Sequence, residues 1–420
     1  MLERLVECAE DGVTVCRLGQ DRRGEVRLGR FLTNPKVTPD EMVATARAHL
    51  MQRVAGRELQ VIQDTTSLRD DGDKKGVWLH PAIVVDAADG TLLGLLSADF
   101  LVRDGAPLVH CNQRALANKE SRRWVEATEL AADLLAHGAR GVQMIADREA
   151  DLYESFACRP DGVDVLVRAH HDRTLADGGK LSELAECLPL LGETGFDLPP
   201  NPARPARRTR LALRAGPAII ARPKNRRRGD AARLAESVAL TLVEVREIDP
   251  PAGQTPLHWR LLTSRPATTA VEAERIVGLY RQRWQIEQVF RVMKTSGFDI
   301  EAVALDEIAP LKNLACATLI AAIQIQQMLH DRDGQANRPM EDVYDPADQA
   351  IIETIGRTLQ GRTERQKNPH PPRSLAHACW ICARLGGWTG YYGKPGPIVL
   401  VRGHTKLKTM IEGIKRFGLV

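Results

Sequence analysis

The order of apolar runs and helical stretches between residues 59 and 171 constrains the fold of this chain most. A short run, LQVIQDTTSL (59–68), predicts a strand that brings Asp64 to or near its end. Two β-rich runs over residues 77–104, joined by the turn AADG, predict a hairpin. Together these segments predict three antiparallel strands at the start of a sheet.

A second aspartate is expected at the end of a further strand. Residues 119–138 show the pattern of an amphipathic helix that stops at Gly138. The apolar run 142–146 then predicts a buried strand with Asp147 at its carboxyl end, where α/β folds place ligand-binding groups. For Asp64 the plain alternative is an Asx-type turn that closes a strand. Residues 164–171 predict one more strand, which carries Arg168.

The stretch YRQRWQIEQVFRVMK, residues 280–294, predicts a helix with two different faces. Five side chains fall within about 80° of one face, and Trp284 lies beside them: Tyr280, Arg283, Glu287, Arg291 and Lys294. The opposite face is apolar. The plain alternative makes Glu287 a surface ion-pair partner, worth about 0.2–0.5 kcal/mol. The helix is expected to start after Thr268 or Thr269 and to run for about 25 residues.

The composition is that of a soluble protein with room for two or three packed domains: 420 residues, 43% hydrophobic and 27% charged. The formal net charge is only +4, but the cations cluster in three runs, near residues 207–210, 222–228 and 357–373. Local basic runs on a near-neutral chain favour a polyanion partner, although solvated arginines are the alternative. Eight scattered cysteines and no apolar window of membrane-spanning length indicate a reduced, cytoplasmic protein that binds no membrane.

The rest of the chain supplies the expected domain limits. Residues 1–55 end in a helix capped near Thr38 or Asp40. The sequence before Phe31 shows no sustained hydrophobic period. Residues 56–300 form the expected core, interrupted at about 172–257 by a β-rich basic insertion. Residues 301–420 are mostly helical and could mediate dimerisation. Periodicity alone gives a mixed α/β protein, and the element order is that of the ribonuclease-H-like fold.

Three motifs together resemble a known family. The pattern Y-x2-R-x3-E-x6-K, the segment QDTTSL and the segment DREADLYE are similar to the cut-and-paste DDE transposases of the IS-four family of bacterial insertion sequences, the Tn-five type among them. The resemblance covers most of residues 30 to 390. It implies that Asp64, Asp147 and Glu287 are catalytic and bind metal. Glu149 and Asp151, from the same DREAD stretch, are rivals for the second ligand, although acidic residues there also suit a helix start.

The resemblance also implies a cofactor and DNA contacts. Mg²⁺, with Mn²⁺ as a substitute, prefers carboxylate oxygens, and two such ions support in-line phosphoryl displacement. Tyr280, Arg283 and Lys294 would contact phosphates, and Arg168 is a weaker candidate. The counterparts of Trp259 and Trp284 in the family stack on a base turned out of the helix. The plain alternative makes Trp259 a packing residue and Trp284 part of a half-buried rim.

The expected function is therefore that of a DNA transposase. It would cut both strands at its element's ends, join them to target DNA, form a homodimer when assembled on DNA, and be associated with the nucleoid in the cytoplasm. One alternative is an N-terminally shortened relative that binds DNA, cuts ends poorly and inhibits transposition. A plain ribonuclease-H-type nuclease is disfavoured by the basic insertion and the helical tail.

Overall fold

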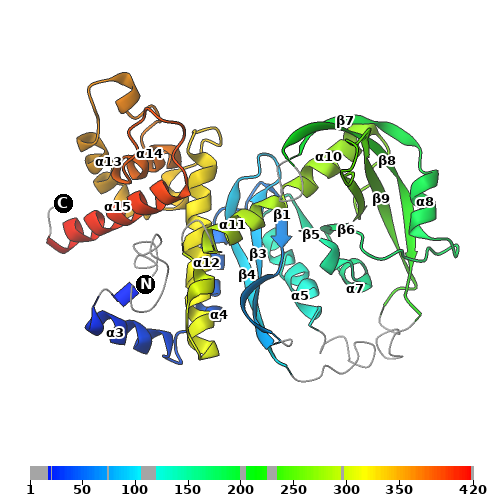
Figure 1. Cartoon of the computed structure of the whole chain (residues 1–420), viewed down its shortest axis with the longest axis horizontal. Helices are drawn as coiled ribbons and strands as arrows, with labels where there is room; N and C mark the ends of the chain where they lie inside the picture. Colours follow the sequence, from blue (N-terminus) through cyan, green and yellow to red (C-terminus); the bar gives the residue numbers. More distant parts are fainter. Residues whose placement is uncertain are drawn as a thin grey trace. The chain divides into compact units, whose positions relative to one another are not determined.

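The computed structural model of the chain describes residues 18–19, 21–72, 75–105, 120–198, 205–224, 234–294 and 298–417. The chain divides into two compact units (Figure 1). We call the unit formed by Val54–Asp64 and Ala106–Trp284 the sheet unit. We call the unit formed by Met1–Arg53, Thr65–Gly105 and Gln285–Val420 the helical unit.

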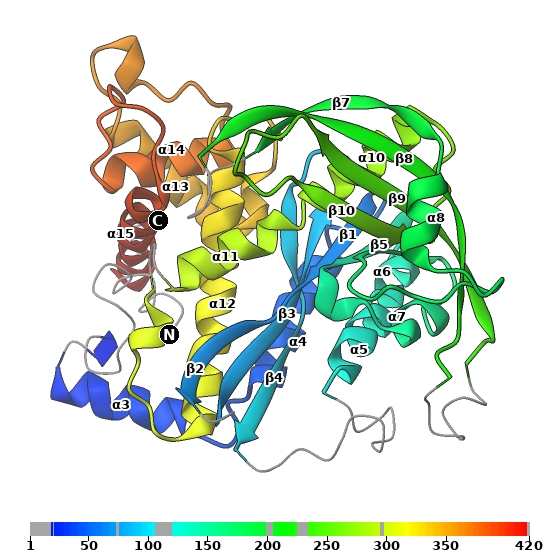
Figure 2. The ribbon, with the colours of Figure 1, turned by 45° about the vertical axis from the view of Figure 1, so that its right-hand side comes forward.

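A mixed sheet forms the centre of the sheet unit. Its strands lie in the order β1 (Glu58–Gln63), β5 (Gly141–Ala146), β6 (Val163–Arg168), β10 (His258–Thr263), β9 (Ser237–Ile248), β8 (Arg207–Ala221) and β7 (Leu190–Leu198). β1, β5 and β6 are parallel, and the remaining strands pair antiparallel (Figure 2, where β7 to β9 are green). All residues of β1 and β5 except the first of each are buried, and three residues of β1 and four of β5 are apolar, as expected of parallel strands covered on both faces.

Short helices follow the strands of this unit. They are α5 (Arg122–Leu130), α6 (Ala132–Ala136), α7 (Tyr153–Ala157), α8 (Leu181–Cys187), α10 (Ala270–Arg281) and the 3-10 turn η3 (Arg148–Ala150). Thr269 caps α10, and its hydroxyl and the Glu272 carboxylate form a reciprocal capping box. The expected helix over 119–138 is confirmed for its described part, except that it breaks at Ala131 between α5 and α6.

Two expected elements differ from the structure. The run 59–68 is two strands, β1 and β2, because the chain leaves the extended ladder at Asp64–Thr65. The helix expected from Thr269 to Lys294 is interrupted at Gln282–Arg283, where the amide of Arg283 bonds to the Tyr280 carbonyl three residues back. The chain therefore forms α10 and a separate helix α11 (Trp284–Lys294).

The β-rich stretch 172–257 continues the sheet of its unit. Its strand β9 pairs with β10 along the whole of β10, from His258↔Arg246 to Thr263↔Thr241. β8 pairs with β9 over twelve residues, and β7 completes the edge. Part of the second basic run, residues 225–233, lies outside the described residues.

The helical unit combines an antiparallel sheet with long helices. Its strands are β2 (Thr66–Gly72), β3 (Lys75–Asp86) and β4 (Leu92–Asp104), with β3 and β4 forming the expected hairpin. Its helices include α3 (Arg22–Leu32), α4 (Pro39–Met51), α12 (Ile308–Asp331), α13 (Gln349–Thr358), α14 (Leu375–Leu385) and α15 (Pro397–Phe417). Thr38 caps α4, as predicted.

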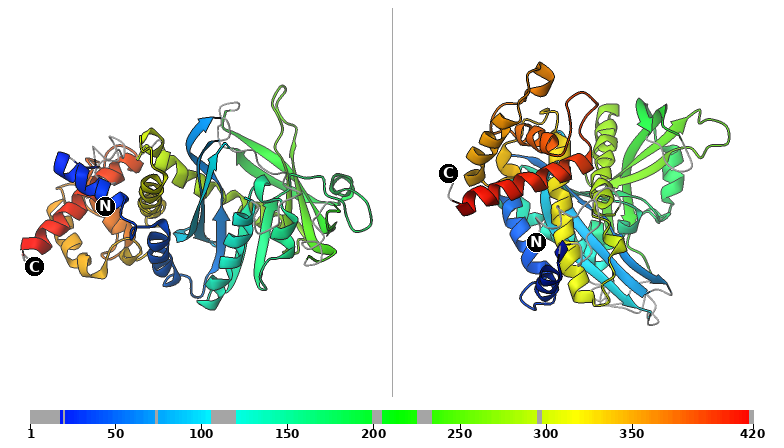
Figure 3. Two further views of the ribbon diagram at one scale, coloured as in Figure 1. Left: turned by 90° about the horizontal axis from the view of Figure 1, so that it is seen from below. Right: turned by 60° about the vertical axis from the view of Figure 1, so that its left-hand side comes forward.

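α12 is the core helix of the helical unit. It contacts α4, β4, α14 and α15. In Figure 3, α12 is yellow, α14 and α15 are orange to red, and α4 and β4 are blue to cyan. By length and composition alone α12 could cross a membrane, which corrects the expectation that no such segment exists. However, 72% of its most apolar window is buried inside the described protein.

Candidate active site

Two aspartates end neighbouring parallel strands of the sheet unit. Asp64 follows β1, and Asp147 follows β5. β1 and β5 are in register with Val61 opposite Met144 and Ile62 opposite Ile145. Continued by two residues, this register puts Asp64 level with Asp147. Because neighbouring strands lie about 4.8 Å apart, the two carboxylates share one edge of the sheet.

Asp64 forms an ion pair with the turn between α10 and α11. Its Oδ2 accepts a hydrogen bond from Nη1 of Arg283 at 2.7 Å. Both side chains are mostly buried, with 17% of Asp64 and 16% of Arg283 exposed. The pair neutralises a carboxylate that burial would otherwise penalise. The ion pair lies at the break between the two helices, where the Arg283 amide bonds to the Tyr280 carbonyl.

Asp147 caps the short turn that follows its strand. Its Oδ1 accepts a hydrogen bond from the amide of Glu149 at 2.9 Å.

The two rival carboxylates, Glu149 and Asp151, have other partners. Glu149 is 61% exposed and lies 3.4 Å from Arg123. Asp151 is buried and accepts hydrogen bonds from Arg173 and from the amides of two residues that follow β6. Asp151 therefore has the contacts of a structural residue.

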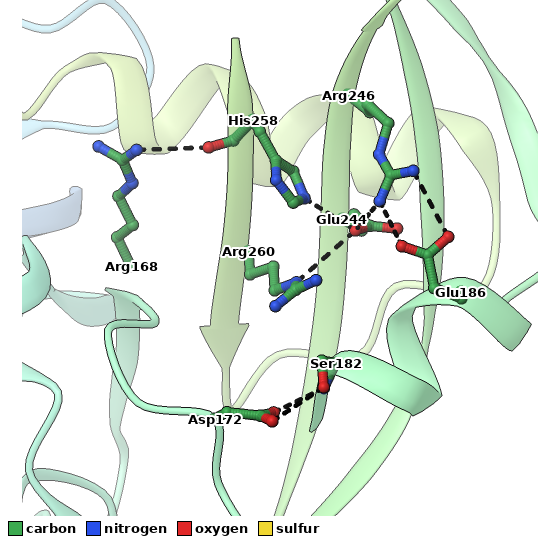
Figure 4. Close-up of polar contacts among 8 residues, drawn as sticks. All are labelled: Arg168, Asp172, Ser182, Glu186, Glu244, Arg246, His258 and Arg260. Atoms are coloured by element: carbon green, nitrogen blue, oxygen red, sulfur yellow. Dashed lines mark hydrogen bonds and ion pairs between the residues drawn. The ribbon is translucent and has the colours of Figure 1, made fainter. Parts of the chain in front are cut away.

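Arg168 and Tyr280 form a polar pair beside Asp147. The two side chains interact electrostatically with each other and with Asp147. Burial lowers the pKa of Arg168 and raises the pKa of the Tyr280 hydroxyl, so the hydroxyl stays protonated at neutral pH. Arg168 also donates to the main-chain carbonyl of His258 at 3.3 Å (Figure 4).

A cavity of about 800 Å³ opens next to this pair. It is lined by aromatic and cationic side chains that include Phe196, Trp259, Tyr280, Trp284, Arg148, Arg168, Arg281 and Arg283. Trp259 packs edge-on between Phe196 and Tyr280, with ring centroids 5.7 and 5.3 Å away. Trp284 is 51% exposed, and thus combines a large apolar ring with access to solvent. Such a wall suits a flat, negatively charged ligand such as a nucleotide.

Two buried glutamates on β9 support this wall, and the sequence pattern did not identify them. Glu244 is 1% exposed and accepts from His258 Nε2 at 2.9 Å and from Arg246 at 3.1 Å, with Arg260 at 3.6 Å (Figure 4). Although burial opposes ionisation, the hydrogen bond from His258 and the charges of Arg246 and Arg260 keep the pKa of Glu244 below its usual value. The signal in the sequence was a glutamate within a mostly apolar strand, SVALTLVEVREI.

The second of these glutamates, Glu247, fastens the loop before β10. Its carboxylate is paired with Arg207 and accepts from the Thr209 hydroxyl at 2.7 Å and the Leu257 amide at 2.9 Å. The hydrogen bonds from Arg207 lower its pKa to about 2. Because Leu257 also lines the cavity, Glu247 holds one side of that wall in place.

The remaining predicted residues lie on α11, in the helical unit. Glu287 is in the first turn of α11, and Lys294 is its last residue. Lys294 is 22% exposed and forms an ion pair with Glu301 at 2.6 Å. The sheet unit by itself thus brings together Asp64, Asp147, Arg168 and Tyr280, with Trp259 and Trp284 on the cavity wall.

The oxygen donors at the sheet edge are of the kind that Mg²⁺ prefers. Within the described ranges, no group of three or more His, Cys, Asp or Glu side chains is close enough to hold one ion.

Comparison with known protein families matches residues 61–323 to the transposase DDE domain. The matched stretch includes Asp64, Asp147 and Glu287. Such a domain implies a ribonuclease-H-like core, an enzyme of phosphoryl transfer and a protein that binds DNA, and DDE transposases generally use divalent metals. Since the match covers more than half of the chain, this protein belongs to the transposase DDE-domain family.

Proposed function

We propose that this protein is a transposase of the IS-four kind that cuts DNA at the ends of an insertion sequence and joins those ends to target DNA. The observation that carries the proposal is the register of β1 and β5, which puts two aspartates level at the carboxyl edge of a buried parallel pair. Neighbouring cations suit a phosphate at that edge, because Arg283 contacts Asp64 and Arg168 lies within electrostatic reach of Asp147.

In this proposal Asp64 and Asp147 hold divalent ions, and Glu287 is the third ligand on the evidence of its motif. The ion, Mg²⁺ or Mn²⁺, supplies Lewis-acid stabilisation of the attacking and leaving oxygens. The protein positions the DNA around it. Arg283 exchanges its contact with Asp64 for a phosphate, and Lys294 supplies a second phosphate contact. Arg168 and the Tyr280 hydroxyl donate to the phosphate next to the reacting one.

The cavity beside the site is proposed to take a base that leaves the helix when the DNA end is processed. Trp284 offers an exposed ring, and Trp259 offers a ring that Phe196 and Tyr280 hold edge-on. Base–aromatic stacking of about 1–3 kcal/mol would stabilise the displaced base.

The organisation of the whole protein is part of the same proposal. Residues 56–300 serve as the catalytic core, with the insertion at about 172–257. Residues 1–55 serve as a DNA-binding region, and residues 301–420 mediate dimerisation. The active form is a homodimer assembled on DNA, in the cytoplasm and associated with the nucleoid.

The experiment that tests the proposal is cleavage of a duplex that carries the element's ends, with Mg²⁺ present. Asp64→Asn, Asp147→Asn and Glu287→Gln should each abolish strand cleavage and leave DNA binding nearly unchanged, because each removes an oxygen ligand without removing a cation. Glu149→Gln is the matched control, since this exposed neighbour of Asp147 should retain most of the activity. Cleavage at the wild-type rate by any of the three variants disproves that residue's role.

A further inference from the structure

Two loops of the helical unit lie against each other, far along the chain from the proposed catalytic residues of the sheet unit. They are residues 361–373 and residues 387–396, and we call their joint face the paired-loop surface. The Thr363 hydroxyl is 3.1 Å from the Tyr391 hydroxyl. The Arg365 guanidinium stacks over the Tyr391 ring, 5.9 Å from its centroid. The third basic run of the sequence therefore forms a surface with aromatic residues.

The second loop is held in a fixed shape. Trp388 Nε1 donates to the carbonyls of Tyr392 and Gly393 at 3.2 and 3.1 Å. Gly390 has φ of 88°, and a Cβ at this position would lie 2.5 Å from the carbonyl oxygen of Arg365. The glycine thus permits the close approach of the two loops. Because these contacts form within the protein, the surface is organised before any ligand binds.

The charge of the two loops is strongly positive. They contain five arginines and lysines and one glutamate, which gives a formal charge of +4. Intramolecular partners account for three of the cations: Lys367 pairs with Glu364, Arg373 with Glu353 and Lys394 with Asp333. Within the described part of the chain, Arg362 and Arg365 have no ion pair, and both are exposed.

Aromatic exposure on this surface is also high. Tyr392 is 83% exposed and Tyr391 is 45% exposed. An exposed tyrosine presents an apolar ring and a hydroxyl donor at its tip, and both suit a sugar–phosphate backbone. The Tyr391 ring already contacts Arg365, so Tyr392 alone could stack on an unpaired base. This favours a duplex, contacted through its phosphates, over a single strand.

We propose that the paired-loop surface binds the phosphate backbone of duplex DNA and serves the target DNA. This inference rests on the proposed function, because a transposase that joins ends to a target needs a surface for a second duplex. The contacts are electrostatic and independent of sequence, as phosphate contacts carry no sequence information directly.

The test measures binding of the full chain to a scrambled duplex that contains no element ends, between about 50 and 200 mM salt. Arg362→Gln combined with Arg365→Gln should weaken binding about tenfold or more and reduce the slope of log affinity against log salt by about two. Tyr392→Ala should weaken binding while changing that slope little. Arg402→Gln combined with Arg416→Gln removes the same charge from exposed positions on α15 and should leave binding unchanged.

A second measurement separates this inference from the proposed function. In a strand-transfer assay the loop variants should lower the ratio of target joining to end cleavage. If the wild type cuts no ends, the proposed function is wrong, and the binding result still decides the inference. If the Arg362/Arg365 variant binds the duplex with the affinity and the salt slope of the wild type, the inference about the paired-loop surface is wrong. If the variant loses self-association but keeps DNA binding, the surface contacts a second copy of the chain, and the inference is also wrong.

Discussion

At the scale of single residues, the ion pair between Arg283 and Asp64 competes with the binding of metal by Asp64 and of phosphate by Arg283. The two side chains are at hydrogen-bond distance and mostly buried, so each compensates the burial of the other. A carboxylate that binds metal must share or lose this partner. A phosphate that approaches Arg283 competes for the same guanidinium, so DNA binding and release of Asp64 are coupled.

Replacement of Arg283 tests this coupling without DNA. Arg283→Gln should lower the free energy of unfolding by about 3 kcal/mol, because it removes the cation from a mostly buried pair. It should also make Mg²⁺ raise the unfolding temperature more than in the wild type, since Asp64 no longer shares its oxygen with a guanidinium. Thermal unfolding with and without Mg²⁺ measures both effects.

Two controls complete that measurement. Arg281→Gln removes a neighbouring exposed cation that stacks on Phe196 and should not change the response to Mg²⁺. The double variant Asp64→Asn with Arg283→Gln should lose the added stabilisation by Mg²⁺. An identical response to Mg²⁺ in the wild type and in Arg283→Gln would show that the pair does not control access to Asp64.

Residues at strand ends could be predicted because their pattern is local. An apolar run followed by a single aspartate identifies both the strand and the residue that ends it, as for Asp64 and Asp147. Glu244 and Glu247 could not be predicted, because apart from Arg246 the partners named above come from β8, β10 and the loop before β10. The sequence of β9 does not reveal the pairings with those other segments.

At the scale of elements, the main difference from expectation is the break between α10 and α11. The sequence from Thr269 to Lys294 has helical periodicity throughout and contains no proline. Arg283 at the break contacts an aspartate 219 residues earlier, and local periodicity does not reveal such a partner. α3 was missed for the opposite reason. Its two glycines weaken the helical signal, whereas a local cap from the Asp21 carboxylate to the Gly24 amide stabilises its start.

The pairing of β8 with β9 depends on Glu247, and pH tests this dependence. The pKa of Glu247 is lowered to about 2, mainly by the hydrogen bonds from Arg207. A lowered pKa means that the group stabilises the fold above its ordinary value of 4.5, and that this contribution is lost as pH falls towards 2. Glu247→Gln should therefore destabilise the protein at neutral pH and abolish that part of the acid sensitivity.

The matched control for this prediction is Glu193→Gln. It removes an exposed β7 partner of Arg210, which lies on β8, and surface pairs contribute less than about 1 kcal/mol. Acid titration of unfolding by circular dichroism provides the comparison. Equal acid sensitivity of the wild type and Glu247→Gln would disprove the role of this residue.

At the scale of the whole molecule, the chain passes between the two units four times, after residues 53, 64, 105 and 284. Two proposed functional residues, Asp64 and Trp284, are the last residues before such a crossing. This arrangement could not be predicted from the local sequence, because each unit is assembled from segments that are distant along the chain. The segment 56–300, expected as one core, contributes to both units.

The two units also contain different acid-sensitive groups, so their stabilities should respond to pH in different ranges. In the helical unit the buried His404 lies 2.7 Å from the Tyr344 hydroxyl, which also contacts Cys382. Burial, with a smaller effect from Lys408, lowers the pKa of His404 to about 3. A histidine with a lowered pKa stabilises the fold above 6.5, and the contribution is lost progressively as pH falls from 6.5 to 3. In the sheet unit the corresponding range for Glu247 begins only below 4.5.

We therefore expect a change from about pH 7 to about pH 5 to lower the opening free energy of α14 and α15 by about 2 kcal/mol through His404. His404→Gln should remove this difference, because glutamine does not titrate. Burial raises the pKa of Asp331 in the same unit, which acts in the opposite direction, so the comparison is between variant and wild type. Hydrogen exchange, resolved by peptide and corrected for intrinsic rates, measures it, with peptides from β8 and β9 as the internal reference. An equal dependence on pH in the wild type and the variant would contradict the assignment.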